Sequence, residues 1–388
     1  MRTPDQPLEQ VTTFDQECRF ETSARDLVRS FTEWQPLEEV IVGRIFPVRT
    51  PASDLSFKLF FNDNLHKNYV FADKEFDLPN RFVEEGEEDL EEFANTLRKE
   101  GVTVRRPEPR QPELTTFVSP YSFHGYLTPP LNIRDQTMIY GNKIIETPPL
   151  VRTRLYENDF LKPLFYDYMR NGAMWFSAPR PMMMDMSFDY SYVLRVNPER
   201  KFSRSSTQFD IGFEMMLDAA QCMRFGRDIV INISNENHRL GYTWLKSVLP
   251  EVRFHEICIT DSHIDGRIVP LRPGKLLIDA RMITTLDMLP AKLRKWDIIP
   301  VTAAELSPAS YEHENLSLAS IAIDINVLSI DENKVVVNKA AKGVLRLLER
   351  HGFTPVPVTF RHGRILGGAF HCVTLDVRRR GECERFLD

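Results

Sequence analysis

The residues best suited to chemistry in this chain include a cysteine that follows a pair of glycines. The run 366–381 reads Leu-Gly-Gly-Ala-Phe-His-Cys-Val-Thr-Leu-Asp-Val-Arg-Arg-Arg-Gly and contains Cys372. Gly367 and Gly368 allow backbone angles and close approaches that other residues resist, so the thiol stands at a corner before a strand-like segment. A thiol presented in this way is a candidate nucleophile. The alternative is a buried cysteine that packs as a small apolar side chain.

Three further segments carry acidic residues and a histidine in positions suited to catalysis. Asp228 opens an apolar strand, and Asp135 stands just ahead of another predicted strand. In Ser-His-Ile-Asp, the alternation of an extended chain points His263 and Asp265 to the same face. Each residue alone also fits a turn or a cap, because Asp and His often satisfy backbone groups there.

Taken together, these residues supply a complete set of catalytic roles. A cysteine nucleophile needs a base or a cation beside it, and His263 would serve. Asp228 would then fix the tautomer of that histidine and stabilise its imidazolium form. Asp135 and Asp265 remain as carboxylates suited to a guanidinium, which pairs bidentately with such groups. Attack of a thiolate on a guanidinium carbon forms no oxyanion, so this site needs anionic clamps.

The elements that position these residues follow a repeated local pattern of helix, tight turn and short strand. Apolar spacing predicts the helices, and β-branched runs predict the strands. The helix-to-strand units cover residues 97–104, 168–175, 244–254, 293–299 and 347–353. The interleaved strands are predicted at 39–42, 137–140, 228–233, 275–278 and 334–337. This pattern fits a pseudo-repeated α/β body whose units share a centre, and it fits an ordinary α/β sandwich equally well.

Composition bounds the class of protein. The chain has 388 residues, of which 42% are hydrophobic and 27% charged, as in ordinary soluble proteins. A net charge of −6 argues against a nucleic-acid-binding protein or a polybasic membrane anchor. No apolar run approaches the roughly 20 residues of a transmembrane helix, and no targeting segment is visible, so we expect a cytoplasmic protein.

Cysteine and histidine spacing indicates neither a metal site nor a nucleotide cofactor. The five cysteines are scattered without a C-x-x-C pair, which is typical of reduced thiols. The nine histidines form no paired-ligand motif, and glycine-rich phosphate-binding motifs are absent from the sequence.

At this point the sequence resembles the amidinotransferases, the family of arginine:glycine amidinotransferase and the inosamine-phosphate amidinotransferases. The resemblance runs from Glu-Trp-Gln-Pro-Leu-Glu-Glu-Val-Ile-Val-Gly at 33–43 to the Phe-His-Cys-Val-Thr-Leu-Asp-Val-Arg-Arg-Arg-Gly motif that closes at Gly381. Between them lie the matching segments 141–148, 172–179, 218–220, 226–228 and 263–265. The resemblance covers about nine tenths of the chain, and its closing motif is highly specific.

The resemblance implies a fold and an organisation. The expected fold is a five-fold pseudosymmetric α/β propeller, with ββαβ-type modules around a central channel that holds the active site. It would form one domain over residues 31–388, after an N-terminal extension, residues 1–30, that we expect to be flexible. The family's chemistry requires no metal or organic cofactor, and its members are often homodimers.

The resemblance also assigns roles to individual residues. Cys372 is expected to be the nucleophile, His263 the acid and base, and Asp228 the partner that orients His263. Asp135 and Asp265 correspond to the carboxylates that hold the guanidinium.

Two more positions are carried over by alignment. Arg281 lies near the arginine that holds the substrate α-carboxylate, with a gap of one residue, and Ser320 falls at a serine that contacts substrate. The implied mechanism is ping-pong: Cys372 takes the amidino group of L-arginine, ornithine leaves, and an acceptor amine then receives the group.

The acceptor is expected to be lysine or a similar ω-amino acid, which would give homoarginine in a bacterial toxin or secondary-metabolite pathway. Segments 50–75, 113–130 and 180–206 depart from the glycine-specific pattern, and Ser262 replaces a methionine found in glycine- and inosamine-specific members. Glycine and inosamine phosphates are the alternative acceptors. The same residues also fit a guanidine hydrolase such as arginine deiminase, but the closing arginine-rich motif favours transfer. A catalytically silent binding protein should lack Cys372, His263 or a carboxylate, and all of these are present.

Overall fold

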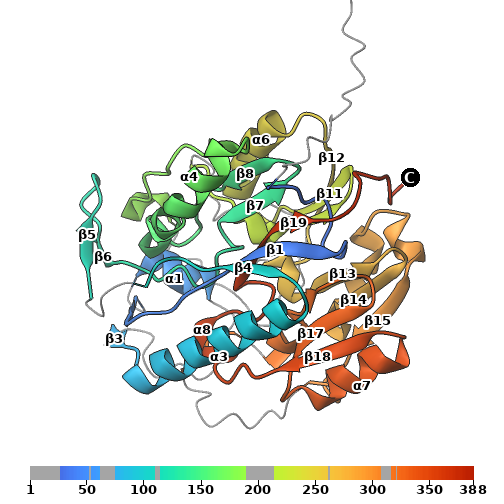
Figure 1. The fold of residues 1–388 in the computed structure, drawn as a ribbon. Coiled ribbons are helices and arrows are strands. Elements are labelled where there is room, and N and C mark those ends of the chain that lie inside the picture. The colour runs from blue at the N-terminus through green and yellow to red at the C-terminus, as the bar shows by residue number, and fades with distance from the viewer. Residues whose placement is uncertain are drawn as a thin grey trace, which may run out of the picture.

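The computed structural model describes residues 27–51, 54–61, 75–109, 114–188, 214–260, 263–306, 316–319 and 321–388. These residues form a mixed α/β structure with five three-stranded sheets and two two-stranded sheets. In Figure 1 the strands of the three-stranded sheets lie inside helices α3, α4, α6 and α7, whereas β3, β5 and β6 lie at the left edge of the view.

The five three-stranded sheets share one pairing pattern. In each sheet the middle strand pairs antiparallel with one neighbour and parallel with the other. With its strands in the order in which they pair, the first sheet is β19 (Thr374–Arg379), β1 (Leu37–Val42) and β4 (Thr103–Arg105), and the second is β7 (Thr137–Tyr140), β8 (Lys143–Glu146) and β9 (Met174–Ser177). The other three, in the same order, are β10 (Cys222–Phe225), β11 (Asp228–Asn232) and β12 (Arg253–Ile257); β13 (Ile268–Arg272), β14 (Lys275–Asp279) and β15 (Asp297–Val301); and β16 (Leu328–Ser329), β17 (Lys334–Asn338) and β18 (Thr354–Val358). The repeated pattern expected from the sequence is therefore present.

Each parallel pair requires a crossover connection, and helices supply it. The connecting helices are α3 (Asn80–Lys99), α4 (Lys162–Arg170), α6 (Glu236–Val248) and α7 (Lys342–Arg350). Between β14 and β15 the expected helix end is instead a pair of 3-10 helices, Ala280–Met288 and Leu293–Lys295. The first contains Ile-Thr-Thr, and consecutive β-branched residues disfavour an α-helix.

The predicted strands are confirmed to within two residues at each end. They follow from runs of Val and Ile that are buried on both faces; in β17, for example, Val335, Val336 and Val337 are completely inaccessible. Two short helices, α1 (Leu55–Phe60) and α8 (Gly363–Leu366), several short 3-10 helices and two two-stranded antiparallel sheets are also present. The two sheets are β2 (Arg49–Thr50) with β3 (Phe76–Asp77), which have α1 between them in the sequence, and the hairpin of β5 (Thr116–Val118) and β6 (His124–Tyr126). None of the helices described has the length and apolarity that crossing a membrane requires.

Segments far apart in the sequence close one of the sheets. Strand β1 lies between β19 and β4, so the N-terminal blue and C-terminal red strands lie side by side in Figure 1. The preceding residues pack as well: Val28 is buried, and the Ser30 amide donates to the Gly141 carbonyl at 3.2 Å. Residues 27–30 thus belong to the packed body rather than to an extension, and residues 1–26 lie outside the described residues.

A buried network of ion pairs lies behind this sheet. Asp376 on β19 contacts three arginines: Arg224 at 2.6 Å, Arg379 at 2.6 Å and Arg134 at 2.7 Å. Arg224 also lies 2.7 Å from Glu33. All five side chains are buried.

The network is stable because almost every charge has several partners. Burial raises the pKa of the Asp376 carboxyl, but the three guanidinium groups outweigh it and hold that pKa well below its usual range. Arg379 also donates to the carbonyls of Gln35 and Ser329, at 2.6 and 3.0 Å. Charges satisfied in this way tolerate a low dielectric, but removal of one partner leaves the others uncompensated.

We therefore expect Asp376→Asn to lower the free energy of unfolding by about 3–5 kcal/mol, because Arg134 and Arg224 would then have only Glu33 as an acidic partner in the network, and Arg379 would lose its contact with a carboxylate. Urea unfolding followed by circular dichroism measures this change. Glu382→Gln is the matched control, since Glu382 pairs with Arg29 at 2.8 Å but its side chain is 75% exposed. That control should cost no more than about 1 kcal/mol. Equal effects of the two substitutions would contradict the central role of the network.

Candidate active site

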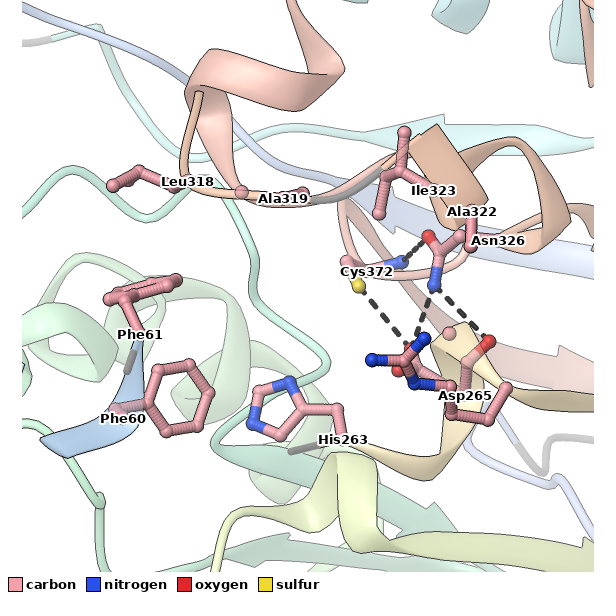
Figure 2. Close-up of a pocket in the computed structure, with 13 residues that line it drawn as sticks. Phe60, Phe61, His263, Asp265, Leu318, Ala319, Ala322, Ile323, Asn326 and Cys372 are labelled. Atoms are coloured by element: carbon pink, nitrogen blue, oxygen red, sulfur yellow. Dashed lines mark hydrogen bonds between the residues drawn. The ribbon is translucent and has the colours of Figure 1, made fainter. Parts of the chain in front are cut away.

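A cavity of about 670 Å³ brings together several of the residues singled out by the sequence. Figure 2 shows Cys372, Asp265 and His263 lining it, with Phe60 and Phe61 beside His263. The complete lining is Phe60, Phe61, His263, Asp265, Gly266, Arg267, Leu318, Ala319, Ala322, Ile323, Asn326, Gly367 and Cys372. No three His, Cys, Asp or Glu side chains in the described part of the chain are placed to hold a metal ion.

The glycine corner places the thiol. Helix α8 ends at Leu366 and is capped by Gly367, whose φ of +73° is left-handed and favours glycine. A Cβ on Gly368 would lie 2.2 Å from Asn132 Oδ1 and 2.8 Å from the Cβ of Cys372, so only glycine fits. The chain then makes a turn and enters β19, which leaves Cys372 only 3% exposed. The corner expected from sequence is thus a packed turn.

Asp265 is the carboxylate next to the thiol. Cys372 Sγ lies 3.3 Å from Asp265 Oδ2 as a hydrogen-bond donor, while Asp265 Oδ1 is buried with no hydrogen-bond partner among the described residues. Burial raises the pKa of Asp265, but hydrogen bonding from His371 and the charges of His371 and His263 outweigh it, so the pKa is lowered. The carboxylate therefore stays ionised, with one oxygen available.

The local structure around Asp265 differs from the extended segment that the sequence predicts. Ile264–Gly266 is a 3-10 helix, and His263 is its extended N-cap residue. Both side chains nevertheless line the same cavity. Ser262 lies outside the described residues.

His263 is held between two carboxylates. Its Nε2 lies 2.8 Å from Asp218 Oδ2, and its Nδ1 lies 3.4 Å from Asp135 Oδ1. Burial lowers the pKa of this imidazole, but the charge of Asp135 and the hydrogen bond to Asp218 outweigh it and raise the pKa to about 9. The ring is therefore protonated at neutral pH and is equipped to act as an acid.

The expected contact between Asp228 and His263 is wrong. Asp228 begins β11, where the register places it beside Arg253 on β12, and its Oδ1 contacts His255 Nε2 at 2.7 Å. Asp218 precedes β10, whereas Asp228 follows the β10–β11 hairpin turn, so the two carboxylates lie at opposite ends of that hairpin. The carboxylate that contacts His263 is Asp218.

Asp135 is a second buried carboxylate near the thiol. Its Oδ2 accepts from Arg154 Nη1 at 2.7 Å, and its Oδ1 has no hydrogen-bond partner in the described part of the chain. Burial raises its pKa, although the charges of His263 and Arg154 oppose this shift. Asp135 therefore lies near enough to the thiol for its charge to act on it, but it does not line the cavity, and its Oδ1 contacts His263 Nδ1 at 3.4 Å.

The cysteine thiol itself is protonated in this arrangement. Burial raises the pKa of Cys372 well above its usual range, and the negative charges of Asp265 and Asp135 raise it further. A cation entering beside these carboxylates would offset their charge and favour the thiolate. The site is therefore poised for a cationic, planar ligand.

Of the two positions assigned by alignment, only Arg281 is among the described residues. Arg281 follows β14, pairs with Asp279 at 2.6 Å, and its side chain is 54% exposed; it does not line the cavity. Arg267, which also pairs with Asp279, at 3.1 Å, does line it. Ser320 lies outside the described residues.

Comparison with known proteins gives a consistent result. No family model matches the chain. It is 33% identical to the L-arginine:L-lysine amidinotransferase of Pseudomonas savastanoi pv. phaseolicola, over 93% of this chain and 96% of the relative. It is 34% identical to the inosamine-phosphate amidinotransferase 1 of Streptomyces griseus, over 91% and 97% of the two chains. It is 33% identical to the mitochondrial glycine amidinotransferase of Xenopus tropicalis, over 93% and 85%.

Solved structures agree with these relatives. An amidinotransferase of the saxitoxin biosynthetic pathway from Microseira wollei aligns with a TM-score of 0.77 at 32% identity, over 93% of this chain and 99% of the other. A dimethylarginine dimethylaminohydrolase aligns over 87% of this chain with a TM-score of 0.53 at 11% identity, which shows a shared fold alone. The chain belongs to the amidinotransferase family.

Proposed function

We propose that this protein transfers the amidino group of L-arginine to an acceptor amine through an amidino-cysteine at Cys372. One observation carries the proposal. Asp265 lines the cavity and keeps Oδ1 without a hydrogen-bond partner among the described residues, and buried Asp135, whose charge reaches the thiol, has only a 3.4 Å contact between its Oδ1 and His263 Nδ1. An unpaired buried carboxylate oxygen is costly, and a planar guanidinium would pair with Asp265 Oδ1 and share Asp135 Oδ1 with His263.

The proposed first half-reaction begins with guanidinium binding, which favours loss of the thiol proton to solvent. The thiolate of Cys372 attacks the guanidino carbon, and the bond from that carbon to the δ-nitrogen breaks. Protonated His263 delivers its proton to that nitrogen, so ornithine leaves as a neutral amine. The high pKa of His263 suits this role, since a general acid must hold its proton before the step.

In the second half-reaction the acceptor amine attacks the amidino carbon, neutral His263 takes a proton from it, and the thiolate leaves. Water must be kept from the intermediate, because hydrolysis would release urea. Aromatic and aliphatic side chains line the cavity around the histidine: the Phe60 ring lies 4.9 Å from the His263 ring between centroids, and Phe61, Leu318 and Ile323 continue the wall.

An amino-acid substrate also needs a cation for its α-carboxylate. Arg267 and Arg281 both contact Asp279, and Arg267 lines the cavity. This pair of arginines is the candidate for that contact.

The five three-stranded sheets are proposed to be the modules of a five-fold pseudosymmetric α/β propeller. Four of them follow the strand–strand–helix–strand order in sequence, with 3-10 helices as the connection in one case, and the fifth joins β19 to β1 and β4. A structural match to an amidinotransferase over most of both chains supports the proposal.

The covalent intermediate is tested by intact-mass measurement after mixing the protein with arginine alone. We expect one amidino adduct on the native protein and none on Cys372→Ala, which should also lose measurable transfer activity. Ornithine should appear in amounts matching the enzyme. An unmodified native protein would support a structural cysteine or a silent binding protein, and citrulline without any acceptor would indicate a guanidine hydrolase.

The acceptor is proposed to be lysine or a similar ω-amino acid, because ornithine has just left a pocket of that shape. The relatives act on different acceptors by name at nearly equal identity, so identity does not separate them. Incubation with arginine and each candidate amine, followed by product mass detection, should yield homoarginine from lysine. Abundant guanidinoacetate from glycine without homoarginine would refute this choice.

The two aspartates near the β10–β11 hairpin give a matched pair for testing His263. Asp218→Asn removes a carboxylate at 2.8 Å, so the pKa of His263 should fall from about 9 by about 1 unit or more. Above about pH 9, ornithine release in a single turnover should slow by about tenfold for each unit by which that pKa falls, since the protonated fraction of the acid falls in proportion. The imidazole is followed by NMR with labelled histidine, and Asp228→Asn is the control. A lower His263 pKa in the Asp228 variant but not in the Asp218 variant would reverse the assignment.

A further inference from the structure

The two carboxylate oxygens of Asp265 differ in their hydrogen-bond partners. Oδ2 accepts three hydrogen bonds: from Cys372 Sγ at 3.3 Å, His371 Nδ1 at 2.8 Å and Asn326 Nδ2 at 3.2 Å. Oδ1 has no hydrogen-bond partner among the described residues. The donors therefore gather on one oxygen and leave the other for a ligand.

His371 connects this carboxylate to the buried ion network. Its ring is 2% exposed, and its Nε2 lies 3.4 Å from Glu33 Oε2, on the side opposite Asp265. The carbonyl of His371 accepts from Arg134 Nε at 2.9 Å, which fixes its backbone as well. With an ionised carboxylate as its partner, Nδ1 must carry a proton, so the ring donates to Asp265.

Asn326 ties the same carboxylate to the backbone of the nucleophile. Its Oδ1 accepts the amide N–H groups of Ala369 and Cys372, at 3.1 and 3.0 Å. A backbone N–H can only donate, so the side-chain oxygen must face the turn and the NH₂ group must face Asp265. Figure 2 shows Asn326 between Cys372 and Asp265.

We propose that His371 and Asn326 are positioning residues, which hold Asp265 by Oδ2 so that Oδ1 is presented to the substrate guanidinium. This inference rests on the proposed arginine specificity of the same cavity. Two donors behind the carboxylate fix its rotation and favour its ionised form. Neither residue needs to touch the reacting atoms.

The physical need for such support arises because one carboxylate contacts both reaction partners. The thiol donates to Asp265, and the guanidinium must bind the same group. If the carboxylate rotated freely, the thiol could donate its hydrogen bond to either oxygen, and the thiol and the guanidinium would compete for the same oxygen. Donors fixed by the backbone turn and by the ion network remove that freedom before substrate arrives.

Two substitutions of His371 test the contribution of each ring nitrogen on its own. The NH₂ of Asn overlays His Nδ1, and that of Gln overlays His Nε2, so His371→Asn keeps the donor to Asp265 whereas His371→Gln loses it. Arginine binding is measured by calorimetry in a Cys372→Ala background, which prevents chemistry. We expect His371→Gln to weaken arginine binding about tenfold or more, with His371→Asn within about threefold of its parent.

The pH dependence supplies a readout that loss of packing would not move. Loss of the donor should raise the pKa of Asp265, so arginine affinity should begin to fall at a higher pH in His371→Gln than in the parent. Asn326→Asp keeps the acceptor for the turn and replaces only the donor, and it should weaken binding at least as much. Crystal structures should show Asp265 rotated in His371→Gln and unmoved in His371→Asn.

The binding measurements and the variant crystal structures can each contradict the positioning role. Equal arginine affinity in the parent, His371→Gln and Asn326→Asp would overturn the positioning role. If the His371 variants do not fold, Asn326→Asp alone decides by the same criterion. If the parent binds no arginine, the proposed donor is wrong, and the position of Asp265 in the variant crystal structures still tests the positioning role separately.

Discussion

The buried ion network around Asp376 is the constraint on which the rest of the structure depends. Its two acids and three arginines come from four separate segments, including β19, β10 and the residues before β1. It joins distant parts of the sequence and fixes the backbone on either side of the nucleophile. Because every member loses hydration on burial, the network is stable only when it is complete. The turn that carries Cys372 is held in place by this network, since Arg134 donates to the carbonyl of His371.

The site in front of the network has an excess of negative charge. His263 lies between Asp135 and Asp218, Asp265 is a third buried carboxylate in the same site, and Arg154 offsets only part of this charge, through its ion pair with Asp135. Such a cavity is unfavourable when it is empty, and a cation relieves it. The same excess keeps the thiol of Cys372 protonated until that cation arrives. The same carboxylates therefore control the ionisation of the Cys372 thiol and favour a cationic ligand in the cavity.

The sequence predicted the strands and the nucleophile's corner because both follow from local properties: buried β-branched runs and adjacent glycines. It also singled out His263, Asp135 and Asp265, by residue type and resemblance, and the structure places all three near Cys372. It failed for the acid beside His263, since Asp228 and Asp218 differ only in which end of a hairpin they occupy. Asn326 and His371 lie close in sequence to predicted site residues, but their contacts with Asp265 exist only in the folded chain.

The position of β1 between β4 and β19 has a consequence for biosynthesis. One edge of this strand finds its partner only after residue 379 has been made, and translation at about 5–20 residues per second imposes a delay of tens of seconds. Through that interval an apolar strand, with Val40, Ile41 and Val42 later fully buried, remains open to wrong partners. This sheet therefore stays incomplete, with one edge of β1 unpaired, through most of the synthesis of the chain.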